Sequence, residues 1–133
     1  MKKYLLDTNI LIHFFNKTDH IVQTSIKLLN EGQVFTSHIA IAEILVGWNE
    51  KKKDEYLSIA YELFPRLGIN DEIAELGSKW RREYKEKGIT LNLSDALIAA
   101  TAKTHNCQLV TLNYKHFPMP ELTIYKDVYT KSA

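Results

Sequence analysis

The chain has 133 residues and nearly balanced charge, with 17 Lys and Arg against 16 Asp and Glu and a formal net charge of +1. This length fits a single domain over residues 1–133, which can bury a core without disulfide or metal cross-links. The charge balance excludes a global attraction to nucleic acid or anionic membranes, so any such contact must come from a local patch. No run approaches the roughly 18 apolar residues of a membrane span, and we expect no membrane association.

The sequence contains a single cysteine, Cys107, which cannot form an internal disulfide. Its neighbours Leu109 and Val110 are apolar, so we predict that its thiol lies in the core. The N-terminus leads into a strand pattern and not into a signal peptide. We therefore expect a cytoplasmic protein.

Apolar periodicity predicts strands and helices in alternation along the first half of the chain. A short strand covers 3–6, a short helix covers 10–15, and an amphipathic helix over 21–29 ends before Gly32. The next predicted elements are a strand over 34–37 and an apolar helix over 38–48.

The second half continues the alternation. A helix over 54–63 is stopped by Pro65, and a third strand is predicted over 67–69. A long charged helix over 71–87 is terminated by Gly88. The last predicted elements are a helix over 94–105 and strands over 108–112 and 123–125. Strands separated by helices require crossover connections, which predicts an α/β fold with a mostly parallel sheet covered on both faces.

Three carboxylates, Asp7, Glu43 and Asp95, lie at or inside apolar stretches with no basic residue at helical spacing. The positions three and four away from Glu43, for example, are Ile, Ala, Val and Gly. An ionised carboxylate that is buried without a partner is very costly, so buried charges are usually paired or coordinate a metal. We therefore predict a bound cation at these three residues.

Most other acidic residues look different. In the helix predicted over 71–87, Glu and Lys or Arg recur four residues apart, which is typical of pairs on a solvent-exposed face. These pairs are Glu75 with Lys79, Lys79 with Glu83, Glu83 with Lys87, and Arg82 with Glu86.

The predicted topology brings the unusual acids together. Asp7 directly follows the first strand, and Asn113 directly follows the strand over 108–112. Glu43 lies in the helix after the second strand, and Asp95 opens a helix for which Ser94 is the predicted N-cap. Because ligands of open parallel sheets bind beyond the carboxyl ends of the strands, we expect these side chains to converge at one sheet edge.

Four segments that contain these residues resemble PIN domains, and above all the small VapC-type ribonuclease toxins of type II toxin–antitoxin modules. They are YLLDTN at 4–9, SHIAIAEI at 37–44, LSDALIAA at 93–100 and LVTLNYKHF at 109–117. Each motif is weak alone, but four in this order at suitable intervals span nearly the whole chain. The resemblance implies an α/β/α sandwich with four to five strands.

The resemblance also implies an endoribonuclease that depends on Mg²⁺, for which Mn²⁺ can substitute, and that hydrolyses RNA phosphodiester bonds. By position, Asp7, Glu43 and Asp95 correspond to the metal-binding acids of the family, and a fourth acidic position falls on Asn113. Because Asn offers oxygen without charge, we expect one well-bound Mg²⁺, with Asn113 orienting a water molecule. Supporting hydrogen bonds are expected from Thr8, Asn9, Ser94 and Thr111.

Partners follow from the same resemblance. It implies an RNA substrate, a cognate antitoxin protein that inhibits the chain, and a homodimer. It implies no direct binding to DNA without the antitoxin. Basic runs at 51–53 and over 79–87 are interpreted as solvated helix faces, with steering of RNA as the alternative.

Several alternative interpretations remain open. The chain could be a catalytically weak or inactive PIN domain that binds RNA or protein, which Asn113 favours. A phosphatase with an aspartyl nucleophile also places Asp after a first strand, but it needs a second acid where this chain has Asn9. Asp7 could be a turn or cap residue, and Asp95 could favour the helix dipole. The five histidines show no ligand spacing, so the proposed chemistry uses no catalytic His.

Overall fold

The computed structural model describes residues 1–129 and contains one five-stranded sheet and six α-helices within that range. The strands are β1 (Lys2–Leu6), β2 (Gly32–Ser37), β3 (Arg66–Leu67), β4 (Gln108–Val110) and β5 (Ile124–Tyr125). The helices are α1 (Thr8–Phe15), α2 (Asp19–Glu31), α3 (His38–Gly47), α4 (Glu50–Leu63), α5 (Asp71–Glu86) and α6 (Leu93–Thr104). Two short 3₁₀ helices, η1 (Tyr114–His116) and η2 (Asp127–Tyr129), complete the described chain.

The sheet is parallel throughout and has the strand order β3-β2-β1-β4-β5. The first strand lies at its centre, where Tyr4 is in register with Val34 on one side and with Gln108 on the other. The chain therefore winds outwards from β1 in both directions, and the strand order reverses between β1 and β4. A reversal of this kind opens a crevice at the carboxyl ends of the two strands.

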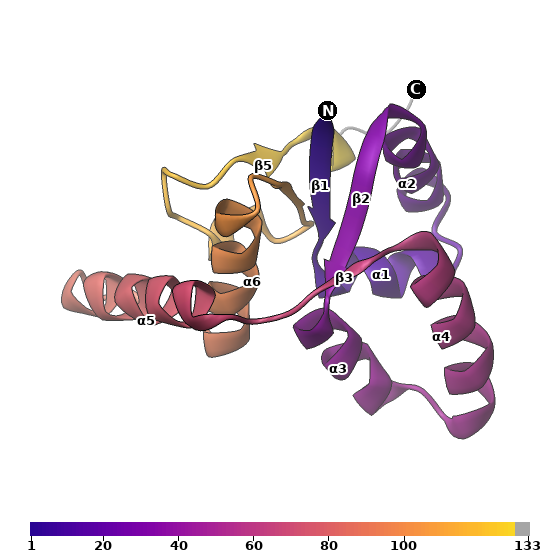
Figure 1. The fold of residues 1–133 in the computed structure, drawn as a ribbon, viewed down its shortest axis with the longest axis horizontal. Helices are drawn as coiled ribbons and strands as arrows, with labels where there is room; N and C mark the ends of the chain where they lie inside the picture. Colours follow the sequence, from indigo (N-terminus) through magenta and orange to yellow (C-terminus); the bar gives the residue numbers. More distant parts are fainter. Residues whose placement is uncertain (130–133) are drawn as a thin grey trace.

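Alternate residues of β1 point into two separate cores. Tyr4 and Leu6 pack with side chains of α1, α2, α3 and α4, whereas Leu5 packs with side chains of α5 and α6. Figure 1 shows α5 and α6 on one side of the sheet and α1, α2 and α4 on the other. The predicted α/β/α sandwich, with a parallel sheet covered on both faces, is confirmed.

Several element boundaries differ from the predicted ones. The helix expected over 54–63 begins at Glu50, because the side chain of Asn49 accepts a hydrogen bond from the backbone N–H of Lys52 and caps it earlier. The strand expected over 108–112 ends at Val110, and the strand expected over 67–69 is only Arg66–Leu67. Gly88 follows α5 with φ of +80°, as its predicted role as terminator requires.

The expected charge pairs on α5 are mostly absent. Of the four, only Lys79 and Glu83 form an ion pair within residues 1–129, with an N···O distance of 3.8 Å. Exposed pairs of long side chains gain little free energy in water, so spacing alone does not fix their geometry. In particular, the predicted pair of Arg82 with Glu86 was wrong for the described chain.

Other side chains behave as ordinary core residues. Cys107 is buried and its thiol is free, as predicted. Trp80 and Tyr84 are buried in the core between α5 and α6, where the Trp80 indole N–H donates to Glu121 at 2.9 Å. A helix both long enough and apolar enough to cross a bilayer does not occur among residues 1–129.

Candidate active site

A depression of about 280 Å³ lies at the carboxyl ends of β1 and β4. It receives side chains from α1, α3, α6 and the segment after β4, so all four residues expected to converge lie around it. No Lys or Arg is among the residues that line it. They are Asp7, Thr8, Asn9, Ile12, Glu43, Asn92, Ser94, Asp95, Asn113 and His116.

Asp7 is the most buried acid of the site, with only 4% of its surface exposed. One carboxylate oxygen accepts the backbone N–H of Thr8 at 2.8 Å and so caps α1. The other accepts the hydroxyl of Thr111 at 2.8 Å and the amide of Asn9 at 3.2 Å. Asp7 therefore caps a helix, which was the alternative interpretation of this residue, and it is also a buried acid at the site.

Burial is the largest influence on the pKa of Asp7 and raises it above its ordinary value. The hydrogen bonds from Thr111 and Thr8 favour the ionised form and oppose this rise. The negative charges of Asp95 and Glu43 raise the pKa further. The site is thus an environment in which a negative Asp7 gains from a nearby cation.

Asn9 ties the start of α1 to the chain after β4. Its side-chain oxygen accepts the backbone N–H of Leu112 at 3.1 Å, while its amide group donates to Asp7 and, at 3.4 Å, to Thr111. These contacts are those expected of a residue that fixes the turn around Asp7. Asn9 is engaged in this turn and supplies no second acid, which leaves the aspartyl phosphatase alternative without support.

Glu43 is exposed and not buried, which corrects the sequence expectation. The helix α3 places it at the open side of the depression, although its flanking sequence is apolar. One carboxylate oxygen accepts the hydroxyl of Thr8 at 2.6 Å, and the other is approached by the hydroxyl of Ser94 at 3.4 Å. Its carboxylate is held by the hydroxyl of Thr8 and has no basic partner among the described residues.

Asp95 lies in the first turn of α6 and is half-buried. The predicted N-cap, Ser94, was wrong: the cap is Asn92, whose side-chain oxygen accepts the backbone N–H groups of Ser94 at 2.9 Å and Asp95 at 3.3 Å. Ser94 also donates its hydroxyl to Asn92 at 2.7 Å. A hydroxyl has one proton, so this shorter bond takes it in preference to Glu43.

His116 is a site residue that the sequence did not reveal. It stands in η1, and its Nδ1 lies 3.7 Å from a carboxylate oxygen of Asp95. Burial raises the pKa of Asp95, His116 lowers it and Glu43 raises it. The motif at 109–117 contains this histidine, but its function could not be inferred because its partner lies on another element.

Asn113 lies at the rim of the depression and is exposed. Its backbone N–H donates to the hydroxyl of Thr111 at 3.0 Å, which is the same hydroxyl that donates to Asp7. Because Thr111 is fully buried, its hydroxyl is held in place and fixes the side chain of Asp7 and the backbone of Asn113. The structure therefore places Asn113 at the depression, where a fourth donor oxygen was expected.

The donor set suits a hard divalent cation. Among residues 1–129, no three or more His, Cys, Asp or Glu side chains form a ready group of metal ligands. Mg²⁺ does not need such a group, because it takes one or two carboxylates and keeps several waters. Carboxylate and amide oxygens around a depression that no Lys or Arg lines, with Asp7 buried, fit a hydrated Mg²⁺.

The fold and the site together define an α/β protein with an acidic depression at the carboxyl edge of a parallel sheet. The sequence model of the PIN domain matches residues 4–119, and this chain belongs to the PIN domain family. The family resemblance expected from the four motifs is thereby confirmed.

Two relatives cover most of the chain. Ribonuclease VapC1 of Methanocaldococcus jannaschii is 36% identical over 115 residues, which are 86% of this chain and 79% of that protein. Ribonuclease VapC2 of Rickettsia felis is 34% identical over 119 residues, which are 86% and 89% of the two chains.

Solved structures agree with this assignment. The chain superposes on a chain of the structure of VapBC2 from Rickettsia felis bound to a DNA fragment from their promoter, with a TM-score of 0.83 and 26% identity over 92% of this chain and 97% of that one. A toxin–antitoxin complex from Klebsiella pneumoniae contains a chain with a TM-score of 0.75 and 33% identity, covering 90% and 95% of the two chains.

Proposed function

We propose that this chain is a metal-dependent endoribonuclease and the toxin of a toxin–antitoxin pair. The observation that carries the proposal is the arrangement of Asp7, Glu43 and Asp95 around one depression that no Lys or Arg lines. The names of the relatives, which are VapC ribonucleases, and the toxin–antitoxin complexes among the similar structures support it.

In this proposal Asp7, Glu43 and Asp95 hold Mg²⁺, directly or through water, and Mn²⁺ can replace it. A bound Mg²⁺ neutralises charge on the phosphoryl oxygens and makes water a better nucleophile at neutral pH. The other described contacts orient the acids. Thr111 and Asn9 fix the carboxylate of Asp7, Thr8 fixes that of Glu43, and the cap residue Asn92 fixes the start of α6 below Asp95.

Asn113 serves in this scheme as a neutral oxygen at the rim, where it can orient a water molecule or a substrate hydroxyl. Since it adds no charge, the site accommodates one tightly bound ion in the absence of RNA. The same residue favours the second candidate function, a PIN domain that binds RNA without cutting it. The two candidates differ in whether RNA is cleaved.

The nuclease proposal is tested by incubating the purified protein with a mixture of transfer and ribosomal RNA. We expect cleavage in Mg²⁺ or Mn²⁺ and none in excess chelator. Asp7→Asn should lower the cleavage rate by about 100-fold or more, because it removes the buried charge that holds the ion. Asp19→Asn, in the exposed first turn of α2, is the matched control and should cleave as the wild type does.

The outcomes separate the two candidates. Cleavage that persists in Asp7→Asn or in chelator would refute the metal-dependent mechanism and point to contamination. RNA binding without cleavage by the wild-type protein would favour the binding module. The comparison with Asp7→Asn is what makes a positive result meaningful.

As partners we propose an antitoxin protein, which covers the acidic depression, and a second copy of this chain. Expression of the chain alone should inhibit growth, and co-expression with the product of the neighbouring gene should restore it. Asp7→Asn should be harmless in both settings. Growth inhibition equal for wild type and Asp7→Asn would contradict the role as a toxin, and light scattering of the purified chain would test the homodimer.

A further inference from the structure

A basic depression lies beside the acidic one and is not used by the mechanism above. It has a volume of about 300 Å³ and is lined by Arg81, Arg82, Lys85, Thr90 and Leu91. Three of these five residues carry positive charge and none is acidic. In a chain whose net charge is only +1, this is a local concentration of cations.

A third depression, of about 310 Å³, links the basic and acidic sites through shared walls. It shares Thr90 and Leu91 with the basic depression, and Asn92, Asp95 and His116 with the acidic one. The loop between α5 and α6 therefore borders all three. Lys115 adds a further cation to the wall of this middle depression.

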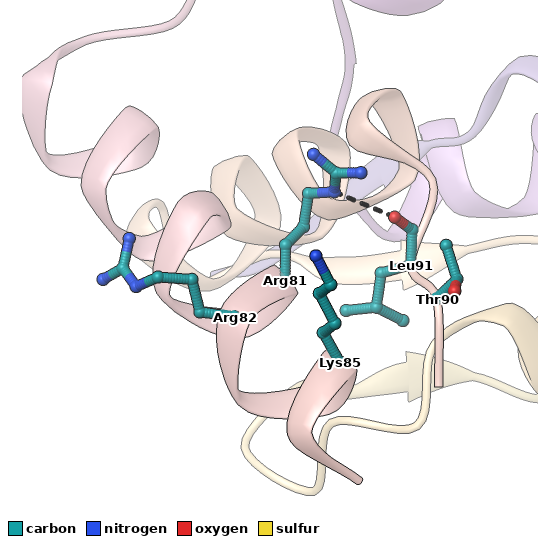
Figure 2. A pocket seen from close by; sticks show the side chains of 5 residues that line it. All are labelled: Arg81, Arg82, Lys85, Thr90 and Leu91. Atoms are coloured by element: carbon teal, nitrogen blue, oxygen red, sulfur yellow. Dashed lines mark hydrogen bonds between the residues drawn. The ribbon is translucent and has the colours of Figure 1, made fainter. Parts of the chain in front are cut away.

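The loop also holds one of the cations in place. The Nε of Arg81 donates to the carbonyl oxygen of Leu91 at 2.9 Å, so the guanidinium is fixed above the loop. Figure 2 shows Arg81 and Lys85 extending from α5 towards the loop, whereas Arg82 extends away from them at the rim. Arg81 and Lys85 are therefore the cations best placed to contact a ligand in the depression.

These cations have no acidic partners among residues 1–129. Arg81 and Lys85 are four residues apart on one helix, where like charges repel each other and destabilise the helix. Arg82 and Lys85 are three residues apart, and the expected pairing of Arg82 with Glu86 does not form. The folded chain thus keeps a mutually repulsive group that an anion would stabilise.

We infer that Arg81 and Lys85, with Arg82 at the rim, bind a backbone phosphate of the RNA strand that flanks the cleaved bond. The inference rests on the proposed function, because a strand seated in the acidic depression can reach the basic one along the middle depression, which shares walls with both. A fixed guanidinium presents parallel N–H donors that match phosphate oxygens, and Lys85 adds a mobile point charge. The contact is independent of base sequence and serves to hold the strand.

The inference is tested by RNA binding without cleavage. The full chain with Asp7→Asn, in chelator, is titrated against a fluorescent single-stranded RNA of mixed sequence, and anisotropy gives the dissociation constant. Adding Arg81→Gln and Lys85→Gln should weaken binding about 10-fold or more and make the slope of log K against log salt shallower by about 1 to 1.5. Arg82→Gln should have a smaller effect.

The matched control is the double variant Lys2→Gln, Lys103→Gln, which removes the same charge from two exposed positions. Lys2 begins β1 and Lys103 lies in the last turn of α6, so each is at the end of its element away from the acidic depression. It should change the dissociation constant less than about twofold. Because Arg81→Gln also removes the bond to Leu91, Lys85→Gln alone is a second variant that leaves the loop contact intact. It should still weaken RNA binding about threefold or more.

Equal RNA affinity in the Arg81/Lys85 variant and its parent, or equal losses in the control, would overturn the inference. So would binding of a hexaglutamate peptide that depends on Arg81 and Lys85 while RNA binding does not, because the depression would then serve an acidic protein segment. The result of this binding experiment can be distinguished from the result of the cleavage experiment. Loss of RNA binding in these variants with no cleavage by the wild type would refute the nuclease and leave the phosphate contact standing.

Discussion

Asp7 combines two roles in one carboxylate. One oxygen caps α1 through the N–H of Thr8, and the other accepts hydrogen bonds from Thr111 and Asn9. The cap fixes the position of the carboxylate, and burial makes its charge costly. Its structural role therefore places a charge where a cation is favourable, and the two interpretations of Asp7 are compatible.

The first prediction concerns the stability of Asp7→Asn without metal. Burial raises the pKa of Asp7, so the native state binds this proton more tightly than the unfolded chain does. Protonation of Asp7 therefore stabilises the native state at acidic pH, and this contribution to the free energy of unfolding is lost as the pH rises through the raised pKa. At pH 7 in chelator, Asp7→Asn should therefore have a larger free energy of unfolding than the wild type, measured by urea denaturation.

Added Mg²⁺ or Mn²⁺ should reverse this order. An ion that binds the native state stabilises it by mass action, about 2.7 kcal/mol at 100 times its dissociation constant. The wild type should gain stability in this way and Asp7→Asn should not. Equal stabilisation of the two proteins by the ion would show that it binds elsewhere.

A second prediction concerns Thr111, whose buried hydroxyl donates to Asp7 and accepts from the backbone of Asn113. Thr111→Val keeps the shape but removes the hydroxyl, which should cost about 1–3 kcal/mol of stability and about 10- to 100-fold in cleavage rate or metal affinity. Thr111→Ser retains the hydroxyl and should retain most of the activity. Equal losses of cleavage rate in Thr111→Ser and Thr111→Val would show that the hydrogen bond to Asp7 does not support activity.

At the scale of elements, helix starts decide where the acids lie. Asp7 caps α1, Ser37 caps α3 and Asn92 caps α6, and the three candidate ligands lie at or within about two turns of these starts. The amino end of a helix favours negative charge because its backbone N–H groups are unpaired and its dipole is positive there. The starts of α1 and α6 therefore lower the cost of placing Asp7 and Asp95 at the depression, whereas Glu43, in the second turn of α3, lies beyond the reach of this effect.

The element-scale prediction compares two N-caps. Asn92→Ala removes the side-chain acceptor for the N–H groups of Ser94 and Asp95, and should cost about 1 kcal/mol of stability. Because it also loosens the turn that carries Asp95, cleavage should fall by about 10-fold. Asn49→Ala, which uncaps α4 away from the depression, should cost similar stability but no activity. Equal loss of activity in both variants would mean that global stability, and not the turn, limits catalysis.

At the scale of the whole molecule, the central position of β1 decides that one site forms. Because β1 pairs with both β2 and β4, the residues that follow these strands meet at one edge. The backbone N–H of Asp7 donates to the carbonyl of Val110 at 2.9 Å, so the ends of β1 and β4 are joined directly. Figure 1 shows α3 continuing below the carboxyl end of β2, and α6 running alongside the sheet.

The corresponding prediction concerns the pairing of β1 with β2. Gly32 is in register with Lys2, and a methyl group at Gly32 would overlap the Lys2 carbonyl. Gly32→Ala should therefore force the two strands apart and cost about 1–3 kcal/mol of stability, measured by urea denaturation. Gly47→Ala is the matched control, because no heavy atom lies within 4 Å of a methyl group there. It should be neutral or stabilising by up to about 1 kcal/mol, and a similar loss in both variants would contradict the steric argument.

Local sequence patterns predicted the elements of this fold better than the exposure of single side chains. The run of strands and helices was predictable because apolar periodicity reports local burial directly, and the four motifs identified the family. Glu43 shows the limit of such reasoning, since its apolar neighbours predicted burial while its carboxylate is exposed. A helix buries only one face, so apolar residues on that face do not bury a side chain that projects from another.

The sequence by itself determined the order of elements, the chain's membership of the PIN family and the identity of the acids. Local chemistry is sufficient for these, because helix and strand periods and turn residues act over a few positions. Only the tertiary structure decided that His116 faces Asp95, that Asn92 caps α6 and that Arg81 is fixed by Leu91. The contacts of His116 and Arg81 join separate elements, and the cap depends on backbone dihedrals at the end of a loop. Their geometry is therefore set only when α5, α6 and the chain after β4 pack together.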